Sequence, residues 1–174
     1  MNRGAIFSLP NVVSMSRLVL AAGFVGARGP EERLALIGVA SVTDFLDGWL
    51  ARRRNAATRW GALIDPIADR VFVLAAVSAF LVSGELTVAQ YFILLSRDIM
   101  TAVGFVVARI VPWLRPVEFK ARQLGKLVTV LQLATFVAVL AAPSLVSPLV
   151  VAVGVASAAA VADYTLALWR DRAR

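Results

Sequence analysis

The stretch Asp44–Asp69, DFLDGWLARRRNAATRWGALIDPIAD, carries four aspartates and four arginines in a chain otherwise dominated by Ala, Val, Leu and Ile. Asp44 and Asp47 are three residues apart, and Asp65 and Asp69 are four apart, so each pair shares a face if its segment is helical. Gly48 continues the first stripe with a small residue, which leaves room for a ligand. The stretch predicts two successive helices that each present two acids.

Composition sets the class of protein around this stretch. Apolar residues make up 60% of the 174 residues, whereas a soluble domain usually has about 45–50%. Mean hydropathy is +0.80. These values predict an all-α integral membrane protein with a single domain, residues 1–174. The net charge of +7 comes in short basic clusters between apolar runs, which is typical of contact with anionic lipid and predicts no nucleic-acid partner.

A bilayer-spanning helix needs about 20 mostly apolar residues, and the chain offers six such segments. They are expected at residues 11–27, 34–50, 64–82, 88–111, 124–142 and 145–169. Residues 1–10 are expected to form a short interfacial segment that is retained rather than removed as a signal peptide.

Basic residues predict the orientation of these spans. The connection after the second span has four arginines, the connection after the fourth has several Lys and Arg, and the end of the chain has three Arg. The connections after the third and fifth spans have none. By the positive-inside rule, both termini and the acidic stretch are expected on the cytoplasmic side of the cell membrane.

Four carboxylates at one membrane depth repel one another and are costly near hydrocarbon. The chain has no Cys and no His, so a metal bound there must use oxygen ligands, which favours Mg²⁺ or Mn²⁺. Two such cations side by side usually clamp a phosphoryl group. Arg52 is close enough in sequence to hold a phosphate by two hydrogen bonds.

Each of these residues also has a structural explanation when taken singly. Asp65 before Pro66 could cap a helix, and Arg53 and Arg54 could simply anchor the topology. Capping and topology anchoring explain the four aspartates together much less well, because the acids occur in pairs on two successive predicted helices.

The fixed residues spell D-x2-D-G-x2-A-R-x8-G-x3-D-x3-D, which resembles the signature of the CDP-alcohol phosphotransferases. The matching positions are Asp44, Asp47, Gly48, Ala51, Arg52, Gly61, Asp65 and Asp69. The resemblance extends to six spans, to LPNVVSMSR before the first span, and to LGKLVTVLQ at the fifth.

This resemblance implies transfer of a phosphatidyl group from CDP-diacylglycerol to an alcohol with release of CMP, in a homodimer that binds two divalent cations. It implies metal ligation by Asp44, Asp47, Asp65 and Asp69, with Asp69 also the general base. The positions that match CDP-binding residues are Gly48, Arg52, Thr58, Asn11 and Arg17.

Arg97 and Asp98 lie near the middle of the fourth span, where charges usually mark function, although a structural ion pair between helices is the alternative. SRDIM, with Phe105 and Arg109 after it, resembles CMP-forming cardiolipin synthases more than phosphatidylglycerophosphate synthases. Phosphatidylglycerol is therefore the favoured acceptor and glycerol 3-phosphate the alternative. The candidate acceptor-binding residues are Arg97, Asp98, Arg109, Arg115, Lys120, Arg122 and Lys126.

Two more remote interpretations remain. Membrane prenyltransferases also pair aspartates on two helices, but they need more spans and lack the spacing of Gly48, Arg52 and Gly61. A non-enzymatic carrier would need acids accessible from both sides of the membrane, whereas these acids cluster at one side. Metal-dependent release of CMP would distinguish the three.

Overall fold

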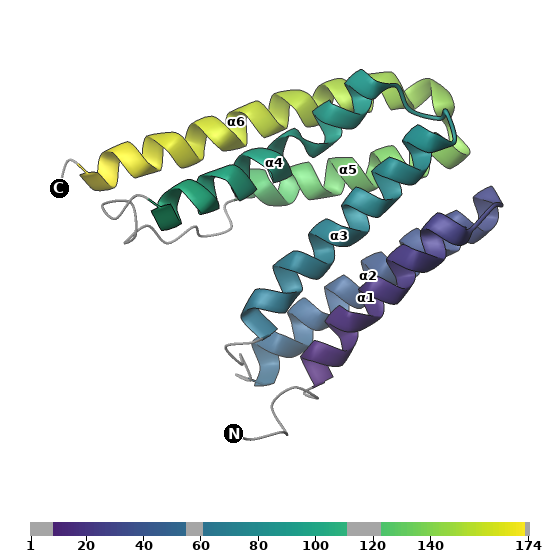
Figure 1. Ribbon diagram of the computed structural model, residues 1–174, viewed down its shortest axis with the longest axis horizontal. Helices are drawn as coiled ribbons and strands as arrows, with labels where there is room; N and C mark the ends of the chain where they lie inside the picture. Colours follow the sequence, from purple (N-terminus) through teal and green to yellow (C-terminus); the bar gives the residue numbers. More distant parts are fainter. Residues whose placement is uncertain (1–8, 55–60, 111–122, 173–174) are drawn as a thin grey trace. The chain divides into compact units, whose positions relative to one another are not determined.

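The computed structural model describes the backbone of residues 9–54, 61–110 and 123–172, and the side chains of residues 16–43, 46, 70–104 and 124–163. Within these ranges the secondary-structure elements are helices joined by short connections, which confirms the predicted all-α fold (Figure 1). The helices are α1 (Leu9–Gly26), α2 (Pro30–Arg54), α3 (Gly61–Val82), α4 (Val88–Ile110), α5 (Gln123–Ala141), the short 3-10 helix η3 (Pro143–Leu145) and α6 (Val146–Arg172).

The helix bounds lie close to the predicted spans, except that α2 is longer at both ends. It begins at Pro30, a residue that suits a first helical position, and its first turn holds Glu31 and Glu32. The Glu32 carboxylate accepts hydrogen bonds from the backbone N–H groups of Arg28 (3.2 Å) and Gly29 (3.4 Å). Hydropathy locates only the apolar part of a helix, whereas Glu and Arg extend it because both are good helix formers.

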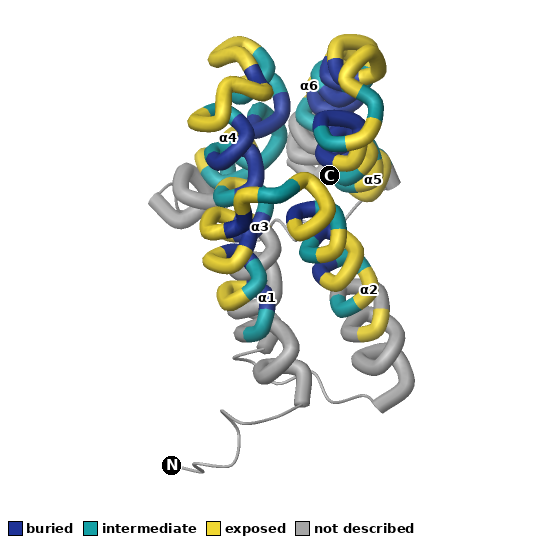
Figure 2. Tube along the Cα trace, turned by 90° about the vertical axis from the view of Figure 1, so that its right-hand side faces the viewer, coloured by how far each residue is buried: buried dark blue, intermediate teal, exposed yellow. Residues whose placement is uncertain are grey.

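Two helical segments in the described part of the chain are long and apolar enough to cross a membrane, Leu124–Ala141 and Pro143–Asp163. Ser16–Gly26 and Arg70–Val82 are apolar but shorter. Large hydrophobic side chains such as Val82 and Val155 are exposed, and Figure 2 shows that exposed positions follow the helices along their lengths. An apolar exterior of this kind suits a lipid environment. The arrangement with six spans stays a prediction, and so does an interfacial segment at residues 1–10.

The chain divides into two compact units, Met1–Glu85 (unit 1) and Leu86–Arg174 (unit 2). In unit 1, α1 packs against α2 and α3. Phe24 of α1 is fully buried and makes edge-to-face contacts with Phe72 and Phe80 of α3, at ring-centroid distances of 6.0 and 5.3 Å. Such aromatic pairs stabilise packing by about 0.5–1.5 kcal/mol beyond the burial of their area.

Arg33 forms hydrogen bonds that connect the helix ends of unit 1 lying away from the acidic stretch. Its Nη1 donates to the Glu85 carboxylate and its Nη2 to the Ser83 hydroxyl, both at 3.1 Å, while Nε donates to the Ala27 carbonyl at 3.2 Å. Ala27 directly follows α1, Arg33 lies near the start of α2, and Ser83 and Glu85 directly follow α3. The start of α2 and the end of α3 therefore lie together, and the two helices are antiparallel.

In unit 2, α6 packs against both α4 and α5. The buried core includes Leu94, Val128, Phe136 and Val153. Thr87 caps α4: its hydroxyl accepts from the Gln90 N–H at 3.3 Å, and the Gln90 side chain accepts from the Thr87 N–H at 2.8 Å. This reciprocal pair is a capping box, and it fixes where α4 begins.

Candidate functional site

The acidic stretch lies on the halves of α2 and α3 that are far from Arg33. At about 1.5 Å per residue, Asp44 and Asp47 lie about 16 and 21 Å along α2 from Arg33. On α3, Asp69 and Asp65 lie about 21 and 27 Å before Ser83 by the same rise. Because α2 and α3 are antiparallel, the backbone brings all four positions to one end of unit 1.

The side chains of these four aspartates lie outside the described residues, as do those of Gly48, Arg52, Asn11 and Arg109. Thr58, Arg115, Lys120 and Arg122 fall outside the described backbone as well. Among the side chains that the structure describes, no group of three or more His, Cys, Asp or Glu forms a metal cluster. The donor set itself is one that suits hard divalent cations, since it consists of carboxylates, here on two successive helices.

Arg17 is the predicted CDP-binding residue whose side chain the structure describes. It lies on α1 and is only 3% exposed. Arg17 precedes Ala27 by ten residues, so it lies about 15 Å along α1 from the Arg33 end, a level similar to that of Asp44 on α2. A buried guanidinium is costly unless negative or hydrogen-bonding partners surround it. The role of Arg17 in binding CDP stays a prediction.

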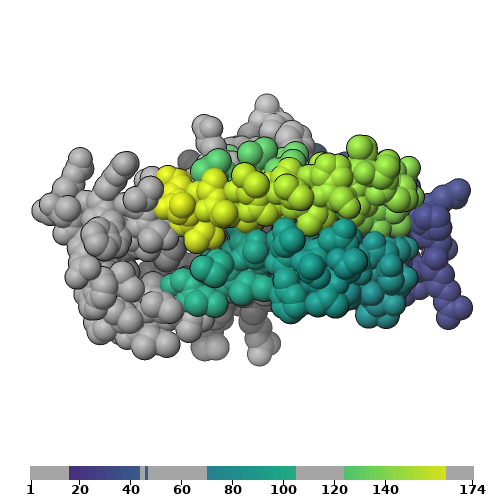
Figure 3. Space-filling model, turned by 90° about the horizontal axis from the view of Figure 1, so that it is seen from above, coloured from purple at the N-terminus to yellow at the C-terminus, as the bar shows by residue number. Residues whose placement is uncertain are grey.

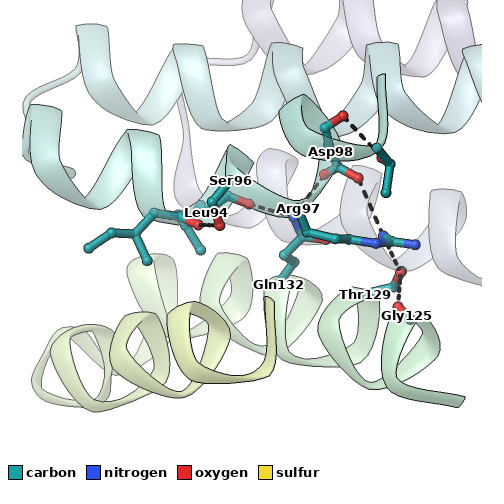
Figure 4. Close-up of polar contacts among 9 residues, drawn as sticks. Leu94, Ser96, Arg97, Asp98, Gly125, Thr129 and Gln132 are labelled. Carbon is teal, nitrogen blue, oxygen red and sulfur yellow. Dashed lines mark hydrogen bonds and ion pairs between the residues drawn. The ribbon is translucent and has the colours of Figure 1, made fainter. Parts of the chain in front are cut away.

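A second group of polar side chains lies between α4 and α5 in unit 2, and we call it the α4–α5 cluster. Figure 4 shows its four members, Arg97 and Asp98 of α4 and Thr129 and Gln132 of α5. Arg97 Nη1 donates to Asp98 Oδ1 and to the Thr129 hydroxyl, both at 3.3 Å. Gln132 Nε2 donates to the Leu94 carbonyl at 2.7 Å and to Asp98 Oδ2 at 3.1 Å. The cluster therefore joins two helices through a charged pair.

The two charges of the cluster differ in how fully their hydrogen-bonding groups are used. Both oxygens of Asp98 accept a bond, and its side chain is 15% exposed. Arg97 is 22% exposed, and its Nε is buried without a partner among the residues that the structure describes. Leaving a buried donor unpaired costs about 1–3 kcal/mol. A buried donor without a partner is uncommon in native structures and needs a physical explanation.

The sequence placed Arg97 and Asp98 at a functional position, but it did not single out Thr129 and Gln132. Both are polar residues in an apolar span, three apart and hence on one helix face, within the stretch LGKLVTVLQ. That spacing is the sequence feature that could have identified them as candidate functional residues. Lys126, a further candidate, is on α5 and exposed.

Unit 2 also has an apolar groove of about 630 Å³ between α4 and α6. Figure 3 shows α6 lying along α4 on one face of this unit. The groove is lined by Phe92, Ile93, Ser96, Met100, Gly154, Ser157, Ala158, Val161 and Ala162. Gly154 allows the close approach, since a Cβ there would lie 3.1 Å from Ile93 Cγ2.

Comparison with known proteins identifies the family of the chain. Residues 7–169 match the model of the CDP-alcohol phosphatidyltransferase family, so the chain belongs to this family, whose members are membrane-bound enzymes. The resemblance found in the motif is thereby confirmed at the level of the family.

Three similar proteins illustrate the range of the family. A CDP-diacylglycerol–glycerol-3-phosphate 3-phosphatidyltransferase of Aquifex aeolicus is 36% identical over 102 residues, which cover 56% of this chain and 57% of that protein. One of the same description from Escherichia coli is 40% identical over 76 residues, 40% of this chain and 42% of that protein. A cardiolipin synthase (CMP-forming) of Streptomyces coelicolor is 32% identical over 107 residues, 56% of this chain and 50% of that protein. The chain thus spans about half the length of the curated relatives that it matches.

Proposed function

We propose that this protein transfers the phosphatidyl group of CDP-diacylglycerol to the hydroxyl of a glycerol-type alcohol and releases CMP. The observation that carries this proposal is the antiparallel course of α2 and α3, whose near ends meet where Arg33 contacts Ser83 and Glu85. This course supports the prediction that Asp44, Asp47, Asp65 and Asp69 lie at one end of unit 1. The family match supports the same reaction class.

In this proposal the four aspartates hold two divalent cations, Mg²⁺ or Mn²⁺. When bound, these cations neutralise the pyrophosphate of the donor and make the phosphorus easier to attack. The CDP moiety is held by Gly48, Arg52, Thr58, Asn11 and Arg17. Among them, buried Arg17 supplies a fixed positive charge, and its burial strengthens its attraction to phosphate.

The chemical step is a displacement at the phosphorus that carries the diacylglycerol. The acceptor oxygen forms a new bond to this phosphorus, and the bond from the phosphorus to the bridging pyrophosphate oxygen breaks. Asp69 takes the proton of the acceptor hydroxyl as general base, and CMP leaves with the electron pair of the broken bond. Direct attack by the acceptor is favoured over an enzyme-bound intermediate.

Glycerol 3-phosphate is the acceptor that the relatives favour, because the Aquifex and Escherichia proteins are named for it. This differs from the preference for phosphatidylglycerol drawn from SRDIM and Phe105. Phosphatidylglycerol remains the second candidate, supported by the Streptomyces relative. Both acceptors carry a phosphate. The proposed acceptor-binding residues are Arg97, Asp98, Arg109, Arg115, Lys120, Arg122 and Lys126.

The membrane side of the active site and the oligomeric state are proposed from the charge distribution and from the family resemblance. The active site opens at the cytoplasmic side of the cell membrane, because the basic connections flank the acidic helices. The protein acts as a homodimer, as the family resemblance implies.

The test uses purified protein in detergent with CDP-diacylglycerol and Mg²⁺ or Mn²⁺, and with each acceptor supplied separately. Release of CMP and the mass of the lipid product are measured. Phosphatidylglycerophosphate from glycerol 3-phosphate is expected, and cardiolipin from phosphatidylglycerol would reverse the order of the two acceptors. Asp69→Asn should lower the rate by a factor of about 10²–10⁴. If no CMP is released with either acceptor, the proposed function is wrong.

A further inference from the structure

Arg97 uses only one of its nitrogen atoms in the α4–α5 cluster. Both of its hydrogen bonds to described residues start from Nη1, to Asp98 Oδ1 and to the Thr129 hydroxyl. Nε is buried and has no partner among the described residues. The Arg97 side chain as a whole is 22% exposed, so another part of its guanidinium is accessible, and a guanidinium suits the oxygens of a phosphate.

The α5 side chains fix how Arg97 is oriented. The Thr129 hydroxyl donates its proton to the Gly125 carbonyl at 3.2 Å, so a lone pair of its oxygen faces Arg97 Nη1. Gln132 is 1% exposed, and its amide holds both the Leu94 carbonyl and Asp98 Oδ2. Asp98 is thereby fixed between Gln132 and Arg97 (Figure 4). A chain of contacts runs from α5 through Asp98 to the guanidinium.

We propose that Gln132 and Thr129 are positioning residues that orient Arg97 so that the exposed part of its guanidinium binds the phosphate of the acceptor. Asp98 links these residues to the guanidinium, because one of its oxygens accepts from Gln132 and the other from Arg97. Asp98 also neutralises Arg97 while no acceptor is bound, which lowers the cost of a charge in an apolar helix pair. This inference rests on the proposed function, in which either acceptor carries a phosphate.

The experiment measures steady-state kinetics of the full-length protein in detergent, with glycerol 3-phosphate in one arm and phosphatidylglycerol in the other. Gln132→Leu removes the amide at similar size, and Thr129→Val removes the hydroxyl at the same shape. We expect each variant to raise the KM for the accepted acceptor about tenfold, the loss typical of one hydrogen bond to a charged group. The KM for CDP-diacylglycerol and kcat should stay within about twofold of the wild type, an effect below 0.5 kcal/mol.

Thr135→Val is the matched control on the same helix. Thr135 is fully buried, and its hydroxyl donates to the Leu131 carbonyl of its own helix rather than to the cluster. Its acceptor KM should equal that of the wild type. Thermal unfolding checks that each variant is folded. If Gln132→Leu does not fold, Thr129→Val carries the test, because it leaves both Gln132 bonds in place.

A double-mutant cycle separates positioning from general loosening of the helix pair. Once Arg97→Lys has removed the planar guanidinium, adding Gln132→Leu should change the acceptor KM by less than about twofold, because the two residues act as one unit. Additive effects would overturn the inference, as would an unchanged acceptor KM in Gln132→Leu and Thr129→Val. In those cases the wild-type enzyme still releases CMP and the proposed function stands. Absence of CMP from the wild type would overturn both.

Discussion

The guanidinium of Arg33 and the carboxylate of Glu85 lie 3.1 Å apart and connect the start of α2 to the residues after α3. Arg33 also lies over the rings of Phe24 and Phe80, with its Cζ 5.6 and 5.7 Å from their centroids. One side chain therefore joins the ends of all three helices of unit 1. Because Arg33 lies far from the acidic end, a substitution there tests the stability of unit 1 without changing the proposed catalytic residues.

Arg33→Met should destabilise unit 1 by about 2 kcal/mol, because three hydrogen bonds and two ring contacts are lost and the Ala27 carbonyl loses its side-chain donor. Glu85→Gln is the matched control and should cost less than about 1 kcal/mol, since Glu85 is 37% exposed and the pair is accessible to solvent on that side. Thermal unfolding in detergent measures both. Equal effects of the two changes would show that Arg33 acts only through its ion pair.

Removal of divalent cations should abolish CMP release, and Mg²⁺ or Mn²⁺ should restore it. Metal should also raise the unfolding temperature, because a cation that binds only the folded protein adds about 2.7 kcal/mol at one hundred times its Kd. Combined Asp44→Asn and Asp65→Asn should remove this gain. Glu31→Gln, an exposed carboxylate at the other end of α2, is the control and should leave it intact.

If metal stabilised the Asp44→Asn and Asp65→Asn protein as much as the wild type, the cations would bind elsewhere. The unfolding measurement needs no substrate, so it tests the metal site independently of the acceptor.

Arg17→Gln should raise the KM for CDP-diacylglycerol by about tenfold or more, as expected for losing a buried charged hydrogen bond to phosphate. The KM for the acceptor should change little. Arg28→Gln provides the comparison, because Arg28 is exposed and lies near the Arg33 end of unit 1. A larger change in the KM for the acceptor than in that for CDP-diacylglycerol would move Arg17 out of the donor site.

Gly154→Ala and Gly38→Ala form a matched pair on helices of the two units. Alanine in a helix is favoured over glycine by about 1 kcal/mol. At Gly38 the new methyl meets nothing within 4 Å, so the full gain should appear as a higher unfolding temperature. At Gly154 it meets Ile93 at 3.1 Å, so α4 and α6 must separate slightly and the gain should be cancelled. An equal rise in unfolding temperature in both variants would show that α4 and α6 accommodate the added methyl group at no cost in stability.

The sequence by itself determined the helical fold, the positions of the helices and the candidate residues of the acidic stretch. These follow from local rules, because apolar runs locate helices and spacings of three and four put Asp44 with Asp47 and Asp65 with Asp69 on one face. Charged helix ends were missed, as at α2, because hydropathy does not detect them. The eight-position motif named the family without reference to any packing.

Only the tertiary structure showed that Arg33 and Glu85 join the far ends of α2 and α3, and that Arg17 is buried. It also paired Arg97 and Asp98 with Thr129 and Gln132, which lie more than thirty residues further along the chain. No local pattern fixes which faces of two distant helices meet, because that choice depends on how all the side chains of α4, α5 and α6 pack together. The unpaired Nε of Arg97 becomes visible only after this packing is known.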